Sequence, residues 1–211
     1  TAYAPNMLSM IVVAVMGVVV LLGIIYGLIP VLTFTQGLLT GQKSIQRASE
    51  AEEKSGWITA LQMDRFFRQK KMDQLFREYR DKVKQQRQNG QIVSDLEDIL
   101  NEDVLDLYSW QGVVAQIPGT LTGLGILGTF IGLLRGLRNI NFVTVEAALS
   151  SVQSILTGID TAFYTSIAGV ILSILFNISN NILRNTMDRE MGIFLEVFHR
   201  VVLPTTQEQE R

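Results

Sequence analysis

The sequence predicts an all-α integral membrane protein with three transmembrane helices and long cytoplasmic helical extensions. Hydrophobic residues make up 47% of its 211 residues, and charged residues are absent from three long runs. Basic residues gather between the first two runs and after the third. Two of the runs carry narrow faces of small and hydroxyl-bearing side chains, which a helix that faces only lipid does not need.

The three uncharged runs cover residues 1–42, 107–134 and 161–183. Each exceeds the roughly 20 residues that cross a bilayer as a helix. A soluble protein with three buried helices is the alternative, but buried core helices of this length are uncommon. We therefore predict three transmembrane helices, the last of which extends beyond the bilayer. They lie at about Met7–Thr33, Gln116–Leu137 and Ala148–Leu183.

The distribution of basic residues sets the orientation. The connection between the first two spans holds twelve, from Lys43 to Arg87, whereas the turn between the second and third spans holds only Arg135 and Arg138. By the positive-inside rule the long connection and the tail are cytoplasmic, and the N-terminus and short turn lie outside. Four regions follow: 1–42 with the first span, 43–112 as a cytoplasmic helical region, 113–183 with the second and third spans, and 184–211 as a cytoplasmic tail helix.

The cytoplasmic connection has the pattern of two helices. From Trp57 to Val83 apolar residues recur at spacings of three and four, and Asn89-Gly90 then breaks the pattern. A second helix is predicted to begin at the capping-box sequence Ser94–Glu97. The first half is basic and the second acidic, which favours a solvated hairpin whose halves attract each other. Docking of another subunit or of a cytoplasmic partner is the alternative.

The third helix is predicted to continue into the cytoplasm as an amphipathic tail. Its apolar stripe runs from Ile178 to Val201, and no later element of the chain can cover it, so we expect burial against a neighbouring subunit. His199 lies in this stripe, where we interpret it as an interfacial residue rather than a ligand. Because the first residue is Thr1 instead of Met, the chain need not begin at the biological start, and it is free to continue beyond Arg211.

Small residues of the second and third spans align on one helix face each, because their spacings alternate between three and four. We predict close helix packing through these glycines, since small residues let backbones approach. The same use is expected for the pairs Gly119/Gly123 and Gly23/Gly27. The packing glycines are Gly125, Gly128, Gly132, Gly136 and Gly169. The full faces are Pro118, Thr122, Gly125, Thr129, Gly132 and Gly136 in the second span, and Ala162, Ser166, Gly169, Ser173 and Asn177 in the third.

Hydroxyl side chains near the middle of these spans favour a hydrated ion pathway, with Thr129, Thr165 and Ser166 as its candidates. Any one of them can instead bond a carbonyl of its own helix and be inert. Asp160 is a possible ion entrance at the outer side, and simple interfacial placement is an equal alternative. Hydroxyls do not titrate near neutral pH. If protons move along this path, the titratable group must therefore come from another chain.

Several function classes find no support in the composition. The chain has no cysteine and a single histidine, so we expect no metal site, no cofactor and no enzymatic activity. The net charge of -2 gives no overall attraction to nucleic acid. The sequence from Gly123 to Gly128 fits G-x-G-x-x-G, but it lies at bilayer depth without a preceding strand, so we do not expect nucleotide binding.

The runs Gly125–Gly132 and Gly158–Gly169, followed by Asn177, resemble the pore helices of the MotA/TolQ/ExbB proton-channel family. Three spans with a large first cytoplasmic connection resemble the ExbB and TolQ arrangement rather than the four spans of MotA. The short outer turn and the tail helix most resemble the ZorA motor subunits of the Zorya anti-phage systems. In this resemblance, Thr129 and Ser166 match the pore hydroxyls, and Asp160 is one position away from a Glu that many ExbB-like members have.

The resemblance implies a ring-forming homo-pentamer in the bacterial inner membrane, with a periplasmic N-terminus. Two copies of a single-span subunit of the MotB/ExbD/ZorB kind would supply the missing titratable Asp. The implied function is an ion-driven motor or stator subunit in anti-phage defence, with membrane lipid and the other subunits as its partners. The implied ion is H+, while the pair Thr165/Ser166 leaves Na+ open. An envelope energy transducer of the ExbB/TolQ type and a non-conducting membrane scaffold are the alternatives.

Overall fold

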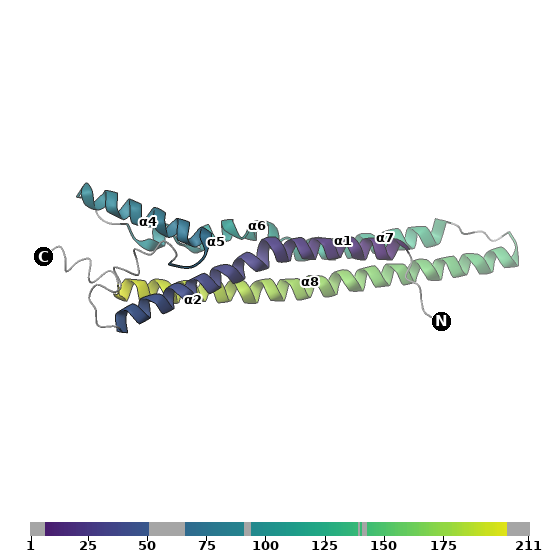
Figure 1. Cartoon of the computed structure of the whole chain (residues 1–211). Helices are drawn as coiled ribbons and strands as arrows, with labels where there is room; N and C mark the ends of the chain where they lie inside the picture. The colour runs from purple at the N-terminus through teal and green to yellow at the C-terminus, as the bar shows by residue number, and fades with distance from the viewer. Residues whose placement is uncertain (1–6, 51–65, 91–93, 139, 141–142, 202–211) are drawn as a thin grey trace. The chain divides into compact units, whose positions relative to one another are not determined.

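The computed structural model describes residues 7–50, 66–90, 94–138, 140 and 143–201, and within these residues all regular secondary structure is helical (Figure 1). Three helices are long and apolar enough to cross a membrane, within Ser9–Arg47, Gln111–Arg138 and Val145–Arg200. The prediction of an all-α chain with three such helices is therefore confirmed. The expected start of a cytoplasmic helix at Trp57 lies outside the described residues.

The described chain divides into two compact units, one from residues 1–27 and 112–180 and the other from residues 28–111 and 181–211. In chain order, the helices are α1 (Met7–Gly23), the π-helical turn η1 (Ile24–Leu28), α2 (Ile29–Glu50), α4 (Lys70–Gln88), the 3-10 turn η2 (Leu96–Asp98), α5 (Glu102–Tyr108), α6 (Gln111–Val114), α7 (Ile117–Arg138) and α8 (Val145–Val201).

The first unit consists of α1, α6, α7 and the N-terminal part of α8. Glycines of α1 and η1 face α7 and α6: a Cβ placed at Gly23 would lie 2.5 Å from the Ile117 side chain, and one at Gly27 would lie 2.6 Å from that of Val114. The outer faces carry exposed apolar side chains, as lipid-facing helices do. They include Leu21, Leu22, Ile126, Phe130, Leu134, Phe163, Ile167, Val170 and Ile174.

A π-helical turn, Ile24–Leu28, interrupts the first long helix. Pro30 follows two residues later and has no backbone N–H, and its ring displaces the carbonyl four residues before it, at Tyr26. The widened turn therefore has a local cause in the sequence. Helical structure then continues through α2 to Glu50, well beyond the predicted end of the span at Thr33.

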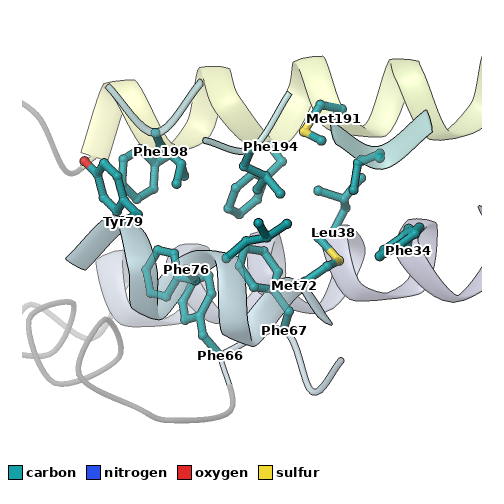
Figure 2. Packing of buried hydrophobic residues seen from close by; sticks show 14 of the residues in the cluster. Phe34, Leu38, Phe66, Phe67, Met72, Phe76, Tyr79, Met191, Phe194 and Phe198 are labelled. Atoms are coloured by element: carbon teal, nitrogen blue, oxygen red, sulfur yellow. The ribbon is translucent and has the colours of Figure 1, made fainter. Parts of the chain in front are cut away.

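The second unit is built around a cluster of buried aromatic and aliphatic side chains from α2, α4, α5 and the C-terminal part of α8 (Figure 2). The Phe67 ring centre lies 5.2 Å from that of Phe194 and 5.6 Å from that of Phe76, both edge to face. Phe66 stacks on Phe76 at 4.9 Å. Such pairs add to the free energy of area burial. The cluster is therefore the hydrophobic core of this unit.

The apolar stripe of the α8 tail is covered within this core. Met187, Met191, Phe194 and Phe198 are all at most 2% exposed. The expectation that a neighbouring subunit buries this stripe is therefore wrong for these residues. The covering side chains come from α2, α4 and the segment just before α4, which all precede the second span. The spacing of apolar residues shows which face of a helix is apolar, but not which residues pack against that face. The sequence pattern alone therefore did not identify the covering side chains.

The acidic segment after the Asn89-Gly90 break starts differently from the prediction. Asp95, not Ser94, is the cap: it begins the single 3-10 turn η2, and its backbone N–H donates to the Asp98 carboxylate at 3.1 Å. The α-helix starts later, at Glu102, where Asn101 Oδ1 accepts from the Val104 N–H. Ser94 instead exchanges two hydrogen bonds with the Gln86 side chain. The capping box is thus shifted by one residue.

Two acidic residues of this segment bond to α8. Arg184 pairs with Asp106, and His199 Nε2 donates to Asp95 Oδ1 at 2.7 Å. Partial burial raises the pKa of Asp95, but the hydrogen bonds from His199 and from the Glu97 N–H outweigh it, so the pKa lies below its ordinary value of 3.8. His199 is therefore a structural partner of the cap residue.

We expect Asp95→Ala to lower the free energy of unfolding of the second unit by about 1 kcal/mol, because it removes an N-cap. Asp95→Asn keeps a capping oxygen and removes only the charge, so its effect is smaller. Since folding lowers the pKa of Asp95, the charge stabilises the fold above the ordinary carboxyl pKa and stops doing so as the pH falls through the lower folded value.

Thermal unfolding of the solubilised chain between about pH 7 and about pH 3 checks this. The difference between the wild type and Asp95→Asn should narrow on the acid side. A difference that stays constant over this range contradicts the role given to the Asp95 charge.

Candidate functional site

In the first unit the backbones of α7 and α8 approach each other closely at several glycines. A Cβ placed at Gly132 would lie 2.9 Å from both the Ala162 backbone nitrogen and the Gly158 carbonyl oxygen. One placed at Gly158 would lie 2.7 Å from the Gly132 carbonyl oxygen and 2.8 Å from the Gly136 Cα. Backbone atoms cannot move aside as a flexible side chain can. Any larger residue here would push the two helices apart.

The contact continues along both helices in the direction of Gly169. A Cβ placed at Gly169 would lie 2.7 Å from the Leu121 carbonyl oxygen and 2.9 Å from the Gly125 Cα. At Gly128 the obstacle is a side chain, since Thr165 Oγ1 would be 2.6 Å away. Thr165 is β-branched and stiff at χ1, so it cannot easily rotate away. The five glycines expected to pack thus all lie in this contact, and among them Gly136 faces Ser154 and Gly158.

Two other glycines of α7 lie elsewhere. A Cβ at Gly119 or Gly123 would meet no atom of the described chain within 4 Å, so the expectation that this pair packs helices together is not met within the chain. Gly158, in contrast, was not among the predicted packing residues. Its spacing from Ala162 and Gly169, four and eleven residues, puts all three on one face of α8. This spacing was the signal that could have identified it.

Thr129 is half-buried at one edge of the α7–α8 contact. Its hydroxyl lies 3.0 Å from the Gly125 carbonyl oxygen, four residues back on its own helix, and 3.3 Å from the Ala162 carbonyl oxygen on α8. One proton is thus shared between two carbonyl groups. The Thr129 oxygen keeps its lone pairs and can still accept a hydrogen bond from another molecule.

Ser166 lies one helical turn beyond Ala162, on the same edge as Thr129. Its Cα would be 3.4 Å from a Cβ at Gly125, the residue whose carbonyl accepts from Thr129. The Ser166 side chain is half-buried and makes no hydrogen bond within the described residues. Most serines and threonines of the spans bond a carbonyl of their own helix, as Thr122 and Thr161 do. Ser166 therefore has an uncommitted hydroxyl within the described residues, as does the half-buried Ser173 seven residues further along α8.

Thr165 precedes Ser166 in sequence but lies inside the contact, packed against Gly128. It is fully buried, and its hydroxyl lies 3.1 Å from the carbonyl oxygens of both Thr161 and Ala162. Adjacent residues of a helix point about 100° apart. The structure therefore separates the Thr165/Ser166 pair into an interior packing residue and an edge residue.

Asp160 is half-buried on α8. It stands six residues before Ser166, which places it about 120° away around the helix axis. The structure therefore does not align Asp160 with the edge formed by Thr129 and Ser166. Among the described residues, no group of three or more His, Cys, Asp or Glu side chains is placed to hold a metal ion.

Comparison with known sequences adds a family to this geometry. A family described as "Anti-phage protein ZorA, Zorya type I system" matches residues 1–188. A stretch of 60 residues is 47% identical to a Zorya protein ZorA of Escherichia coli strain Crooks, and covers 28% of this chain and 10% of that protein. A second Zorya protein ZorA, from Escherichia coli O139:H28, is 43% identical over 60 residues, which are 28% of this chain and 8% of that protein. The aligned stretch thus spans a tenth or less of either relative.

We expect Gly132→Ala to destabilise the first unit by about 1–3 kcal/mol, because its Cβ would overlap backbone atoms of α8. Gly123→Ala is the matched control on the same helix: no described residue obstructs it, and alanine favours a helix by about 1 kcal/mol over glycine. Thermal unfolding of the two solubilised variants measures the difference. Equal destabilisation by both substitutions would contradict the backbone contact described above.

Proposed function

The chain belongs to the ZorA family of type I Zorya anti-phage systems, and on this premise we propose that it is a subunit of an ion-driven membrane motor that acts in anti-phage defence. The family match over residues 1–188 carries this proposal, because it includes the first two apolar helices, the third as far as residue 188 and the whole α7–α8 contact. In this role the chain converts the ion-motive force across the bacterial inner membrane into mechanical work.

The edge of the α7–α8 contact supports an ion pathway. Thr129 and Ser166 lie there together, and the Ser166 hydroxyl is uncommitted within the described chain. A polar group left without a partner in a bilayer costs free energy, so a group of another chain or water is expected to bond it. Thr165 does not share this property, because its hydroxyl is buried and bonds its own helix. We assign the pathway to Thr129 and Ser166 and a packing role to Thr165.

The carboxylate that titrates comes, in this proposal, from a partner. Neither Thr129 nor Ser166 exchanges protons near neutral pH, so a single-span subunit of the MotB/ExbD/ZorB kind contributes a membrane Asp. Five copies of this chain surround two copies of that partner. Protonation of the Asp on one side and release on the other moves it past successive hydroxyl-lined edges. Each charge that crosses 100 mV releases about 2.3 kcal/mol, so several charges can drive one mechanical step.

The proposed ion is H+. A dehydrated Na+ needs several oxygen ligands at once. The hydroxyl that would stand beside Ser166 for this purpose is that of Thr165, which is buried against Gly128 and bonds carbonyl groups of its own helix. The N-terminus is periplasmic and the second unit cytoplasmic, as the positive-inside rule requires. Asp160 stays a candidate for an ion entrance, reached before the Thr129–Ser166 edge.

A non-conducting scaffold is the second candidate function. One observation favours it: the Thr129 hydroxyl already bonds two carbonyl groups, as an inert membrane hydroxyl does. A scaffold needs the glycine contact but not the hydroxyls. The two functions therefore respond differently to substitutions that remove a hydroxyl and keep the side-chain size.

Ser166→Ala is expected to reduce proton flux and phage protection by about tenfold or more, since a hydrogen bond to a charged group contributes about 1.5–3 kcal/mol. Thr165→Val is the matched control, because valine keeps the packing against Gly128 and removes only bonds within α8. The efficiency of plating of a sensitive phage and proton uptake by vesicles measure the two effects. Full protection by Ser166→Ala, at wild-type expression, would leave only the scaffold.

The stoichiometry has its own test, which is co-purification with a single-span membrane protein that carries an Asp in its membrane helix, sought among the neighbouring genes. We expect five copies of the chain to hold two of the partner, and an Asp→Asn substitution in the partner's membrane helix to abolish protection while the complex still forms. A stable assembly of this chain without any acid-bearing partner would contradict the motor.

A further inference from the structure

The second unit holds a surface that the motor proposal does not use. At the C-terminal end of α5, Leu107 and Trp110 are 76% and 61% exposed. Lys71 of α4 lies beside this end, with its Nζ 4.9 Å from the centre of the Tyr108 ring. We propose that Lys71, Leu107, Tyr108 and Trp110 form a binding site for anionic phospholipid at the cytoplasmic surface of the membrane.

The position of Trp110 along the chain places it in the headgroup layer. Arg135 is the first charged residue at the outer end of the second span. A hydrocarbon core of about 30 Å takes about 20 helical residues, which reach back from Arg135 to Ala115. Trp110 stands five residues further, or about 7 Å if helical, which matches the depth of one headgroup layer. Trp and Tyr concentrate in that layer because their rings are apolar at one end and polar at the other.

The backbone conformation of Trp110 indicates that the indole side chain itself is needed at this position. Ser109 ends α5, and Trp110 follows it with φ of 53°, in the left-handed region. The residue after a helix end adopts this conformation most easily when it is glycine, and a bulky side chain is strained there. The helix cap alone therefore does not explain a Trp at this position. An amphipathic ring held at the membrane surface does.

The charges around the site select an anionic lipid. Lys71 is exposed, and its ammonium is held near the Tyr108 ring by a cation–π contact. Of the α5 acids whose side chains the structure describes, Asp106 is paired with Arg184, whereas Asp103 is exposed one helical turn from Leu107. Lys70 precedes Lys71 and is also exposed. The lysines therefore outnumber the unpaired acid, and a phosphate headgroup can bond the Lys71 ammonium while its acyl chains cover Leu107 and Trp110.

Lipid is the occupant we choose rather than a protein partner, because Trp110 is followed directly by Gln111, the first residue of the second apolar span. The patch is thus continuous along the chain with a segment that must enter the bilayer. The inference needs only that span and does not depend on ion conduction.

The chain contains two tryptophans, Trp57 and Trp110, so Trp57→Phe leaves Trp110 as the sole source of tryptophan emission. The full chain with this substitution is reconstituted into phosphatidylcholine–phosphatidylglycerol vesicles in which one lipid or the other is brominated at the upper acyl carbons. Trp110 should be quenched by both, and more strongly by brominated phosphatidylglycerol at equal mole fraction. Lys71→Gln should remove this preference, because one lysine at the surface enriches anionic lipid by about fivefold.

Lys82→Gln is the matched control, since Lys82 is exposed on α4 three helical turns from Lys71. It should leave the preference for phosphatidylglycerol unchanged. Quenching of Trp110 by aqueous iodide and by neither brominated lipid would overturn the site. A preference for phosphatidylglycerol that survives Lys71→Gln would overturn the assignment of the headgroup to Lys71.

Trp110→Gly distinguishes a role of the indole in lipid binding from a role of residue 110 in ending α5. Glycine relieves the backbone strain, so the detergent-solubilised chain should unfold at the same temperature as the wild type or higher. The rise in unfolding temperature on adding phosphatidylglycerol should be lost in this variant, and its retention would overturn the proposal. Failure of the proposed motor function can be distinguished from failure of the lipid site, because Ser166→Ala tests conduction and leaves Trp110 and its quenching unchanged.

Discussion

The backbone contact between α7 and α8 is the constraint on which the rest of the first unit depends. Lipid is as apolar as the side chains of the spans, so no hydrophobic force brings these helices together. Their association relies on van der Waals contact at short range, which the glycines Gly132 and Gly158 permit. The same contact brings the Thr129 hydroxyl to the Ala162 carbonyl and fixes the edge at which Ser166 stands. The contact that packs α7 against α8 therefore also positions the two hydroxyl groups of the candidate pathway.

Helix α8 packs by two different rules along its length. At bilayer depth its contact face consists of small residues, from Gly158 to Gly169, because close approach is what stabilises helices in lipid. In the second unit its contact face consists of large apolar residues, from Met187 to Phe198, because water makes the burial of apolar area favourable. The change of residue size along one continuous helix thus marks the change of solvent. It also explains why the aromatic cluster belongs to the second unit.

The hydroxyl groups of the spans divide by what they already bond. Thr165 and Ser166 are neighbours in sequence, yet one is enclosed between two helices and the other stands at an edge without an internal partner. A rotation of about 100° between adjacent helical residues is sufficient for this difference. Chemical equivalence of side chains therefore says little about their roles, and the hydrogen bonds that each already makes are the more useful guide. By this criterion Ser166 has a hydroxyl that can still donate to another molecule, whereas the Thr129 hydroxyl beside it already bonds two carbonyl groups.

The sequence by itself determined the three apolar helices, the continuation of the third beyond the bilayer and the small-residue faces of α7 and α8. Charge-free length and residue spacing are local properties, so they can be read without a partner. Only the tertiary structure decided that Gly158 packs and Gly123 does not, that Asp95 rather than Ser94 is the cap, and that the tail stripe is buried within its own chain. Each of these depends on which distant segment lies opposite. A periodic pattern shows which face of a helix is apolar or made of small residues. Which segment packs against that face depends on the shape and chemistry of residues far away in sequence.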